Sequence, residues 1–323
     1  MKNDFHDRVA AVVVTYNRKD LLKECLNALL AQSYPLESLV LVDNASTDGT
    51  HDMLRDGGYL DDDRVRLVQM DTNTGGAGGF YAGMKVSSGM DVDWVWVMDD
   101  DTIPGSDSLA GLVEASHTVD QKASFYASCV YGPEGEPMNV PNIDQSKAPN
   151  GYKDWYAHLP QRAVRIADAT FVSLLIRRDA VTRCGLPCKD YFIWGDDTEY
   201  TMRLIRNYGP AYLVGSSSVT HMRFNAKSLS LRQEDNPGRV RMYRYFYRNN
   251  LINRKLYLGK GTFIRFLGGA ILTSFGSLGK PLGGAKFHAV WQGIGGYLSE
   301  RKKFSRYIAD QLQNGAGEPR SGQ

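Results

Sequence analysis

Three consecutive aspartates, Asp99, Asp100 and Asp101, follow an apolar run at residues 94–98. Aromatic and β-branched residues in such a run are typical of a buried strand, so the aspartates should lie where the strand meets solvent. Because side chains alternate along an extended segment, Asp99 and Asp101 should face the same way and Asp100 should point elsewhere. Two such carboxylates suit Mg2+ or Mn2+, although an isolated aspartate run is equally typical of a solvated acidic turn. The position of the run in the fold must decide between the two.

A second acidic pair, Asp196 and Asp197, follows an aromatic run and precedes a helical pattern that ends at Asn207. At the helix N-terminus one aspartate should cap the helix, which contributes about 1 kcal/mol. The positive end of the helix would keep the other carboxylate ionised and ready to accept a proton. His221 ends a strand-like segment, and its neutral imidazole is a suitable further ligand for Mn2+. The sequence thus offers separate candidates for a metal site and a general base.

The elements that must position these residues alternate between strand and helix. Four strands alternating with helices predict a parallel sheet, in which right-handed crossovers bring every carboxyl end to one edge. The polar clusters that follow these strands should therefore converge on one crevice, which favours the metal interpretation of the aspartate run. The four strands are expected at 9–15, 38–42, 65–70 and 94–98, with polar clusters at 15–18, 43–44, 73–79 and 99–101. Further patterns predict a helix at 109–116, strands at 124–131, 164–177, 211–214 and 218–220, and a loop over the crevice at 132–150.

The glycine-rich segment at 75–79 would allow backbone amides to approach a phosphate closely. Its spacing differs from Gly-x-Gly-x-x-Gly, and it follows the third strand instead of the first. Both differences argue against the interpretation that the protein is a nicotinamide dinucleotide-dependent oxidoreductase. A flexible turn before a helix is the structural alternative.

Charge is unevenly distributed along the chain. Residues 232–307 contain 15 Lys and Arg against Glu234, Asp235 and Glu300, a balance of +12, whereas the whole chain sums to +2. Cations alternate with aromatic residues at 239–250, and the apolar run at 263–282 has an uncharged core too short to span a bilayer. We expect a basic helical region at 232–313 that either contacts a membrane surface or packs on the core or on a second subunit. Residues 314–323 should form a disordered tail.

Four motifs together resemble the nucleotide-diphosphosugar transferases of the GT-A fold, glycosyltransferase family 2. The motifs are Val-Val-Thr-Tyr-Asn-Arg, Val-Asp-Asn-Ala-Ser-Thr-Asp, the triple Asp and Trp-Gly-Asp-Asp-Thr-Glu. Within that family, the segments at 73–80, 194–200 and 220–222 are most similar to bacterial galactofuranosyltransferases. The resemblance covers about residues 8–250. It implies an α/β, Rossmann-like, mostly parallel sheet flanked by helices, in a nucleotide-sugar-binding and catalytic domain at 1–231 that precedes the basic helical region.

The resemblance also implies roles for individual residues. Asp99, Asp101 and His221 would hold Mn2+ or Mg2+ on the donor diphosphate. Asp197 matches the position of the catalytic base, and Asp196 would orient the acceptor. The residues implied to contact the nucleotide, diphosphate or sugar are Thr15, Arg18, Asp43, Asn73, Gly75, Gly76 and Asp100.

The implied activity is inverting transfer of galactofuranose from UDP-galactofuranose to a glycan or lipid-linked acceptor. Such an enzyme would act in cell-surface polysaccharide synthesis, such as that of cell wall or O-antigen, in the cytoplasm or at the inner face of the membrane. A rhamnosyltransferase using dTDP-rhamnose is the nearest alternative, because the motifs do not identify the donor sugar. An oxidoreductase and a noncatalytic sugar-nucleotide-binding protein are the alternatives of other classes. We expect no nucleic-acid partner, and the sequence leaves open both peripheral contact with the membrane through residues 239–307 and a homo-oligomer.

Overall fold

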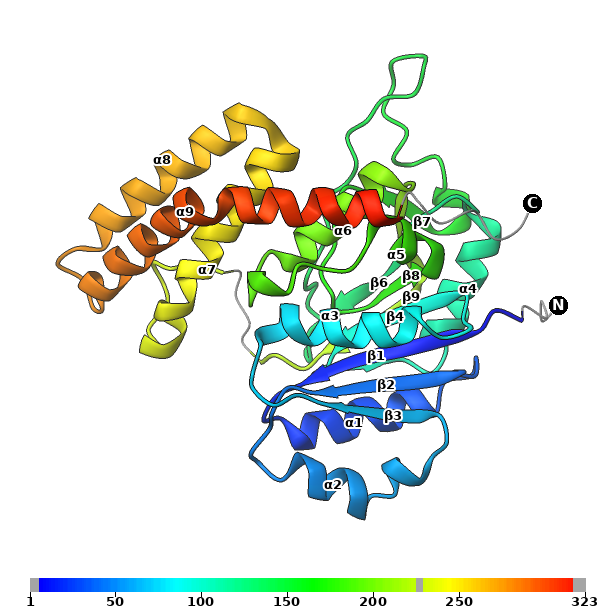
Figure 1. The fold of residues 1–323 in the computed structure, drawn as a ribbon. Coiled ribbons are helices and arrows are strands. Elements are labelled where there is room, and N and C mark those ends of the chain that lie inside the picture. Colours follow the sequence, from blue (N-terminus) through cyan, green and yellow to red (C-terminus); the bar gives the residue numbers. More distant parts are fainter. Residues whose placement is uncertain (1–5, 225–228, 316–323) are drawn as a thin grey trace.

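The computed structural model describes residues 6–224 and 229–315. A nine-stranded mixed sheet lies between helices, and a helical arm extends from one side of it (Figure 1). The strands are β1 Val9–Thr15, β2 Ser38–Asp43, β3 Val65–Gln69, β4 Trp94–Asp99, β5 Thr102–Pro104, β6 Phe125–Tyr131, β7 Ala163–Ile166, β8 Leu174–Arg177 and β9 Ala211–His221. The α-helices are α1 Lys19–Leu30, α2 Thr50–Asp56, α3 Gly75–Ser88, α4 Ser108–Thr118, α5 Arg178–Cys184, α6 Asp196–Asn207, α7 Pro237–Asn253, α8 Gly259–Ser277 and α9 Gly283–Gly315.

The first half of the sheet is parallel, in the order β3-β2-β1-β4. All seven residues of β1 are buried, because helices cover both faces of the sheet and such strands are therefore apolar throughout. Side chains of α1 and α4 pack on one face, and those of α3, α5 and α6 pack on the other. The four carboxyl ends consequently lie at one edge, which confirms the expected placement of the polar clusters.

The second half of the sheet mixes strand directions. β8 lies antiparallel between β4 and β6, whereas β9 is parallel to β6 and antiparallel to β5. The pairing of β5 with β9 places Thr102 opposite His221 and so brings the histidine next to the aspartate run. The single strand expected at 164–177 is wrong, because the chain forms two strands there. β7 pairs with β9, and Asp168 beyond it accepts two hydrogen bonds from Asn142, which turns the chain before β8.

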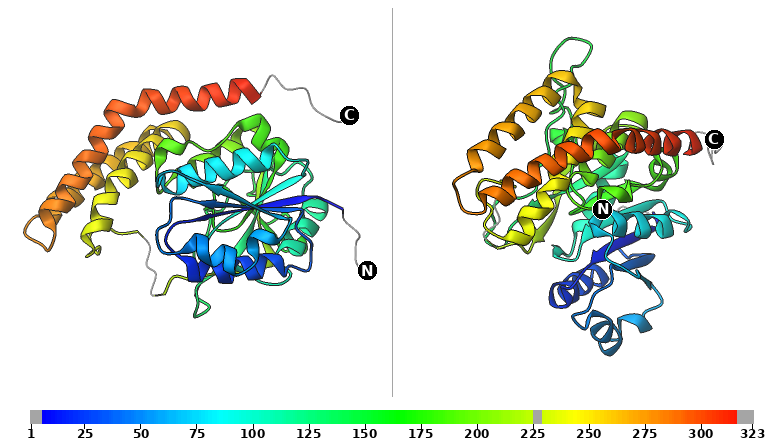
Figure 2. Two further views of the ribbon diagram at one scale, coloured as in Figure 1. Left: turned by 60° about the horizontal axis from the view of Figure 1, so that its bottom comes forward. Right: turned by 60° about the vertical axis from the view of Figure 1, so that its left-hand side comes forward.

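The C-terminal helices α7, α8 and α9 pack together and extend away from the sheet (Figure 2). The end of α9 returns to the catalytic core, where the Gln311 side chain accepts a hydrogen bond of 2.8 Å from Leu186 N. α9 continues to Gly315, so the first two residues of the expected tail, Asn314 and Gly315, are helical; residues 316–323 lie outside the described part. Within residues 6–224 and 229–315, no helix has both the length and the hydropathy needed to cross a membrane.

Candidate active site

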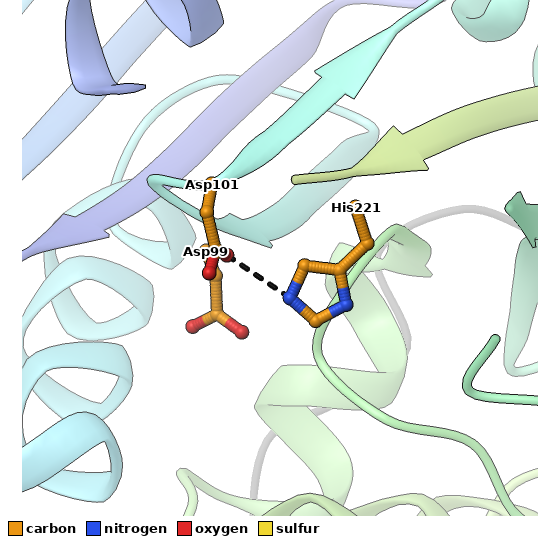
Figure 3. Close-up of side chains that lie close together, drawn as sticks. All are labelled: Asp99, Asp101 and His221. Carbon is orange, nitrogen blue, oxygen red and sulfur yellow. Dashed lines mark ion pairs between the residues drawn. The ribbon is translucent and has the colours of Figure 1, made fainter. Parts of the chain in front are cut away.

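Asp99, Asp101 and His221 converge at the carboxyl edge of the sheet (Figure 3). Asp99 ends β4, Asp101 lies in the turn before β5, and His221 ends β9. One ligand atom from each lies within 4.8 Å of those from the other two. The distance from Asp101 Oδ1 to His221 Nε2 is 3.1 Å. The two aspartates thus meet as predicted, but the reason given was wrong, since the strand ends at Asp99 and a turn, not strand alternation, presents Asp101.

The donor atoms of this cluster fit a divalent cation. Asp101 Oδ1 is buried and, among the described residues, has no hydrogen bond of acceptable geometry. His221 Nδ1 lies 2.9 Å from Asn139 Oδ1, which can accept a proton from it, and this arrangement leaves Nε2 on the side of Asp101, where a neutral imidazole can bind a metal. Burial and the charges of the neighbouring aspartates hold the pKa of Asp99 well above its usual range. A cation here would relieve this repulsion and use the free acceptor atoms.

Asn139 was not identified from the sequence. It lies in the proline-rich segment at 132–150, which was expected to cover the crevice, and its backbone φ is +48°. A single asparagine in a loop carries no periodic or motif signal. Its role as the hydrogen-bond partner of His221 depends on a contact across 82 residues of sequence, so only the structure could reveal it.

Asp100 connects β1 to the metal cluster. Its Oδ2 accepts a hydrogen bond of 2.7 Å from the Thr15 hydroxyl, and its Oδ1 lies 3.2 Å from Arg18 Nη1. The same guanidinium lies 2.5 Å from Asp101 Oδ2. Burial raises the pKa of Asp100 to about 6, although Arg18 and Thr15 act in the opposite direction. Of the predicted nucleotide contacts, Thr15, Arg18 and Asp100 therefore surround the metal cluster, and their contact with a nucleotide stays a prediction.

Asp43 ends β2 and Asn73 follows β3, at the same carboxyl edge of the sheet. Thr15 pairs with Asp43 in the sheet, and Asp43 Oδ1 accepts a hydrogen bond of 2.9 Å from Ser46 N. Asn73 Oδ1 accepts hydrogen bonds from Gly75 N at 2.8 Å and from the Asn44 side chain at 3.2 Å. Asn44 also donates to the Gly75 carbonyl at 2.9 Å and is fully buried. Asn44, to which the sequence assigned no role, thus holds the predicted donor-binding residues together.

The glycine-rich segment is the first turn of α3 and not a loop, which corrects the expectation. Gly75 has a φ of +73°, and a Cβ there would lie 2.0 Å from the Phe192 carbonyl oxygen. Gly79 packs against Val14 of β1, where a Cβ would lie 2.3 Å from a methyl carbon. Gly76, in contrast, has open space around its Cα hydrogen. Close packing explains Gly75 and Gly79, and of the glycines at 75–79 only Gly76 has open space around it.

This difference predicts opposite results for two neighbouring substitutions. Gly75→Ala should lower the free energy of unfolding by about 2 kcal/mol or more, because it adds left-handed strain and a backbone clash. Gly76→Ala should leave stability unchanged or raise it by up to about 1 kcal/mol, since alanine favours a helix. Urea titration of both variants measures this difference. Equal destabilisation would contradict the packing described for Gly75.

Asp196 and Asp197 begin α6, but the residue that caps the helix is Gly195, with φ of +94° and no side-chain hydrogen bond. The expectation that one aspartate caps the helix is therefore wrong. Asp197 is half-buried, and its Oδ1 accepts a hydrogen bond of 2.6 Å from Thr198 N. Burial raises the pKa of Asp197 to about 6 despite the hydrogen bonds from Thr198, and the charge of Asp168 adds to the rise. A carboxylate of this pKa can accept a proton near neutral pH.

Asp196 is the more deeply buried residue of the acidic pair. Its side chain is buried, and burial together with the charge of Asp197 holds its pKa well above the usual range. Its charge also raises the pKa of Asp99, which places it within electrostatic range of the metal cluster. The two acidic clusters predicted from distant parts of the sequence therefore lie close enough for their charges to interact.

The backbone before Asp196 is strained. Phe192 and Trp194 have φ angles of +67° and +61°, and Ile193 N donates a hydrogen bond of 2.8 Å to the Tyr191 carbonyl in a three-residue turn. A side chain of α7 holds this turn: the buried amide of Asn249 lies 3.1, 3.0 and 2.8 Å from the carbonyl oxygens of residues 191, 193 and 194. The helical arm therefore contributes directly to the position of the acidic pair.

Two further residues of α7 hold the same turn in place. Asn253 Nδ2 donates to the Gly195 carbonyl at 2.7 Å, and its Oδ1 accepts from the Tyr191 hydroxyl at 2.8 Å. Arg248 donates to the carbonyl of Asp190 at 2.7 Å and fixes the Asn249 amide through its Oδ1 at 2.9 Å. The sequence indicated a basic aromatic segment here but not these buried polar contacts, since asparagines in a helix resemble surface residues.

We expect Asn249→Ala to lower kcat at least tenfold, because the carbonyl groups of Ile193 and Trp194 lose the amide donor and the strained turn can relax. The affinity for UDP should change little, since the donor-binding residues lie at other strand ends. Transfer kinetics and calorimetry with UDP measure the two quantities. Arg241→Ala, at an exposed position of the same helix, is the control and should retain kcat. An equal loss of kcat and UDP affinity would indicate general unfolding and contradict the positioning role.

Comparison with known proteins identifies the class. Residues 10–183 match the family model for glycosyl transferase family 2, more than half of the chain, and this protein belongs to that family. Galactofuranosyltransferase GlfT1 of Mycolicibacterium smegmatis is 28% identical over 221 residues, which cover 66% of this chain and 70% of that protein. GlfT1 of Mycobacterium tuberculosis is 29% identical over 263 residues, which cover 75% and 81%. Membership in this family argues against the oxidoreductase alternative.

Solved structures share the fold. GalNAc-T7 with UDP, GalNAc and Mn2+ superimposes with a TM-score of 0.58 at 13% identity, covering 95% of this chain and 58% of that one. The mannosyltransferase PcManGT of Pyrobaculum calidifontis, with GDP-Man and Mn2+, gives a TM-score of 0.54 at 20% identity, covering 97% and 87%. At these identities the likeness concerns the fold alone, and it confirms the expected GT-A architecture.

Proposed function

We propose that this enzyme transfers galactofuranose from UDP-galactofuranose to a hydroxyl of a glycan or lipid-linked acceptor, with inversion at the anomeric carbon. The observation that carries the proposal is the buried Asp101 Oδ1, which has no hydrogen bond among the described residues and lies beside Asp99 and His221. The similarity to GlfT1 supports the donor sugar. A UDP-linked donor and a divalent metal agree with the UDP and Mn2+ bound by GalNAc-T7.

In the proposed reaction Asp197 accepts the proton of the acceptor hydroxyl, which Asp196 orients. The hydroxyl oxygen forms a bond to the anomeric carbon while the bond from that carbon to the diphosphate oxygen breaks. UDP leaves with the electron pair of the broken bond, and no covalent enzyme intermediate forms. Mn2+ or Mg2+, held by Asp99, Asp101 and His221, would offset the negative charge that develops on the leaving diphosphate.

We place the acceptor at the cytoplasmic face of the membrane, in cell-surface polysaccharide synthesis. The basic composition of residues 239–307 and the exposed apolar side chains of α8 support contact with an anionic membrane surface. Lysine and arginine near such a surface each contribute about 1 kcal/mol of attraction.

A donor screen tests the proposed activity. Release of UDP or dTDP is measured with UDP-galactofuranose, UDP-galactopyranose and dTDP-rhamnose, each with Mn2+ and with excess EDTA. We expect turnover with UDP-galactofuranose that EDTA abolishes. Preference for dTDP-rhamnose would identify a rhamnosyltransferase, and undiminished turnover in EDTA would contradict the metal site.

A further inference from the structure

A cavity of about 350 Å³ lies between α7 and α8, outside the catalytic residues described above. Phe246 of α7 and Phe266 of α8 contribute aromatic walls, and Thr262 contributes a hydroxyl group. Gly269 has open space around its Cα hydrogen, which leaves that side of the cavity free of side chains. The aromatic walls can therefore accommodate an apolar chain. The two arginines that also line the cavity suit an anionic group instead.

Two arginines, Arg254 and Arg265, line the same cavity. In the described part of the chain neither forms an ion pair with a carboxylate, although Arg254 donates to Asn250 Oδ1 at 2.5 Å. The Arg254 guanidinium lies 4.1 Å from the centre of the Phe266 ring, which fixes its plane. Burial and the charge of Arg265 lower the pKa of Arg254. Two unneutralised guanidinium groups at one cavity suit a phosphate, which accepts their hydrogen bonds and offsets their repulsion.

The side of α8 that faces away from the cavity is apolar and exposed. The side chains of Ile264, Leu272 and Phe275 are 66%, 70% and 55% exposed, and their helical spacing places them together, away from the cavity-lining positions of the same helix. Between residues 236 and 299 the sequence has ten Lys and Arg and no Asp or Glu. The exposed side of α8 is thus suited to a membrane surface, while the arginines and aromatic walls of the cavity, on the other side of the helix, suit an anionic head group and its apolar chain.

The cavity also adjoins the catalytic residues. Arg254 follows Asn253, whose side chain donates to the Gly195 carbonyl in front of Asp196. Arg254 begins the π-helical turn Arg254–Leu258, a rare backbone form that occurs frequently at functional sites. Tyr257 of this turn donates to Glu199 of α6 at 2.6 Å. The segment that carries Arg254 is therefore hydrogen-bonded on both sides of this residue to α6 and the turn before it, which carry the proposed base.

We propose that the α7–α8 cavity binds the phosphate of a lipid-linked acceptor, with Arg254 and Arg265 on the phosphate and the first part of the lipid chain against the aromatic walls formed by Phe246 and Phe266. This inference rests on the proposed glycosyl transfer to a lipid-linked acceptor. It adds a site for the anchor of the acceptor, separate from the donor and metal residues. The chain would hold the acceptor at the membrane while its sugar reaches the carboxyl edge of the sheet.

Vesicle co-sedimentation of the full chain tests the site without any transfer reaction. Vesicles of phosphatidylcholine with a minor fraction of phosphatidic acid are compared with vesicles carrying equal charge as oleate. The double variant Arg254→Gln, Arg265→Gln is compared with Arg241→Gln, Arg244→Gln, which removes the same charge from exposed positions of α7 outside the cavity. We expect the first variant to weaken binding to phosphatidic acid vesicles about tenfold or more, and the second about twofold.

Three results would overturn the proposal. Equal losses in both double variants would mean general attraction to a charged surface, and equal binding to oleate vesicles would exclude phosphate recognition. Displacement from vesicles by millimolar inorganic phosphate would indicate a site for free phosphate. Unchanged UDP binding and melting temperature of the variants show that they are folded. Because lipid binding needs no donor, a failed donor screen and a failed vesicle assay can be told apart.

Discussion

Asp197→Asn should lower kcat by about 10³-fold while the affinity for UDP stays within about twofold of the wild-type value. General base catalysis contributes on the order of 10²–10⁴ to rates, and asparagine cannot accept the proton. The amide oxygen can still accept the hydrogen bond that Thr198 N donates to Asp197, so the helix start should be preserved. Transfer kinetics with UDP-galactofuranose and calorimetry with UDP measure the two effects. A variant that retained most of its turnover would show that another group takes the proton.

The pH dependence of the wild-type enzyme follows from the same residue. Burial raises the pKa of Asp197 to about 6, so the base is protonated below that pH and kcat should fall about tenfold per pH unit in acid. Above about pH 7 the rate should reach a plateau. A kcat that stays constant from pH 5 to pH 8, within the limits of enzyme stability, would contradict the assignment.

The raised pKa also affects stability. Since the folded state binds the proton of Asp197 more tightly than the unfolded state, stability decreases as the pH rises from about 4 through about 6. Asp197→Asn removes the contribution of this one carboxyl, while Asp99, Asp100 and Asp196 keep theirs, and the melting temperature of the variant at pH 8 should equal or exceed that of the wild-type protein. Loss of activity without loss of stability would distinguish a catalytic role from a structural one.

Asp101→Asn should weaken Mn2+ binding at least 100-fold and lower kcat/KM by a similar factor. The substitution preserves shape but removes a negative charge from the cluster with Asp99 and His221. Calorimetry with MnCl2 measures the affinity, and the UDP-galactofuranose assay measures the rate. Asn142→Ala, in the same loop as the His221 partner Asn139 but bonded to Asp168, is the control and should keep the Mn2+ affinity. Equal Mn2+ affinity of wild type and Asp101→Asn would exclude the cluster as the metal site.

The sequence predicted the parallel half of the sheet well because three of its four strands, β1, β2 and β4, consist almost entirely of apolar residues and end in a polar cluster. Rules for crossover handedness then sufficed to bring Thr15, Asp43 and Asp99 to one edge. The antiparallel half was harder. Periodicity could not show that 164–177 divides between two distant strands, since pairing partners are set by tertiary packing and not by local pattern.

Residues that act through other residues were missed for a similar reason. Asn139 and Asn249 carry no local signal, and their roles arise from partners far away in sequence, His221 and the turn at 191–194. The basic character of α7 was recognised, but its buried face was not. Arg248 and Asn249 are buried against the turn at 191–194. Contact of the exposed residues of the arm with a membrane stays a proposal.

The affinity of the protein for UDP, measured by calorimetry with Mn2+ and again with excess EDTA, tests the central claim most directly. The claim is that Asp99, Asp101 and His221 hold a metal that binds the donor diphosphate at the carboxyl edge of the sheet. We predict that Mn2+ tightens UDP binding at least tenfold in the wild-type protein and has no effect in Asp101→Asn. Equal affinity of the wild-type protein for UDP in Mn2+ and in EDTA would contradict the account.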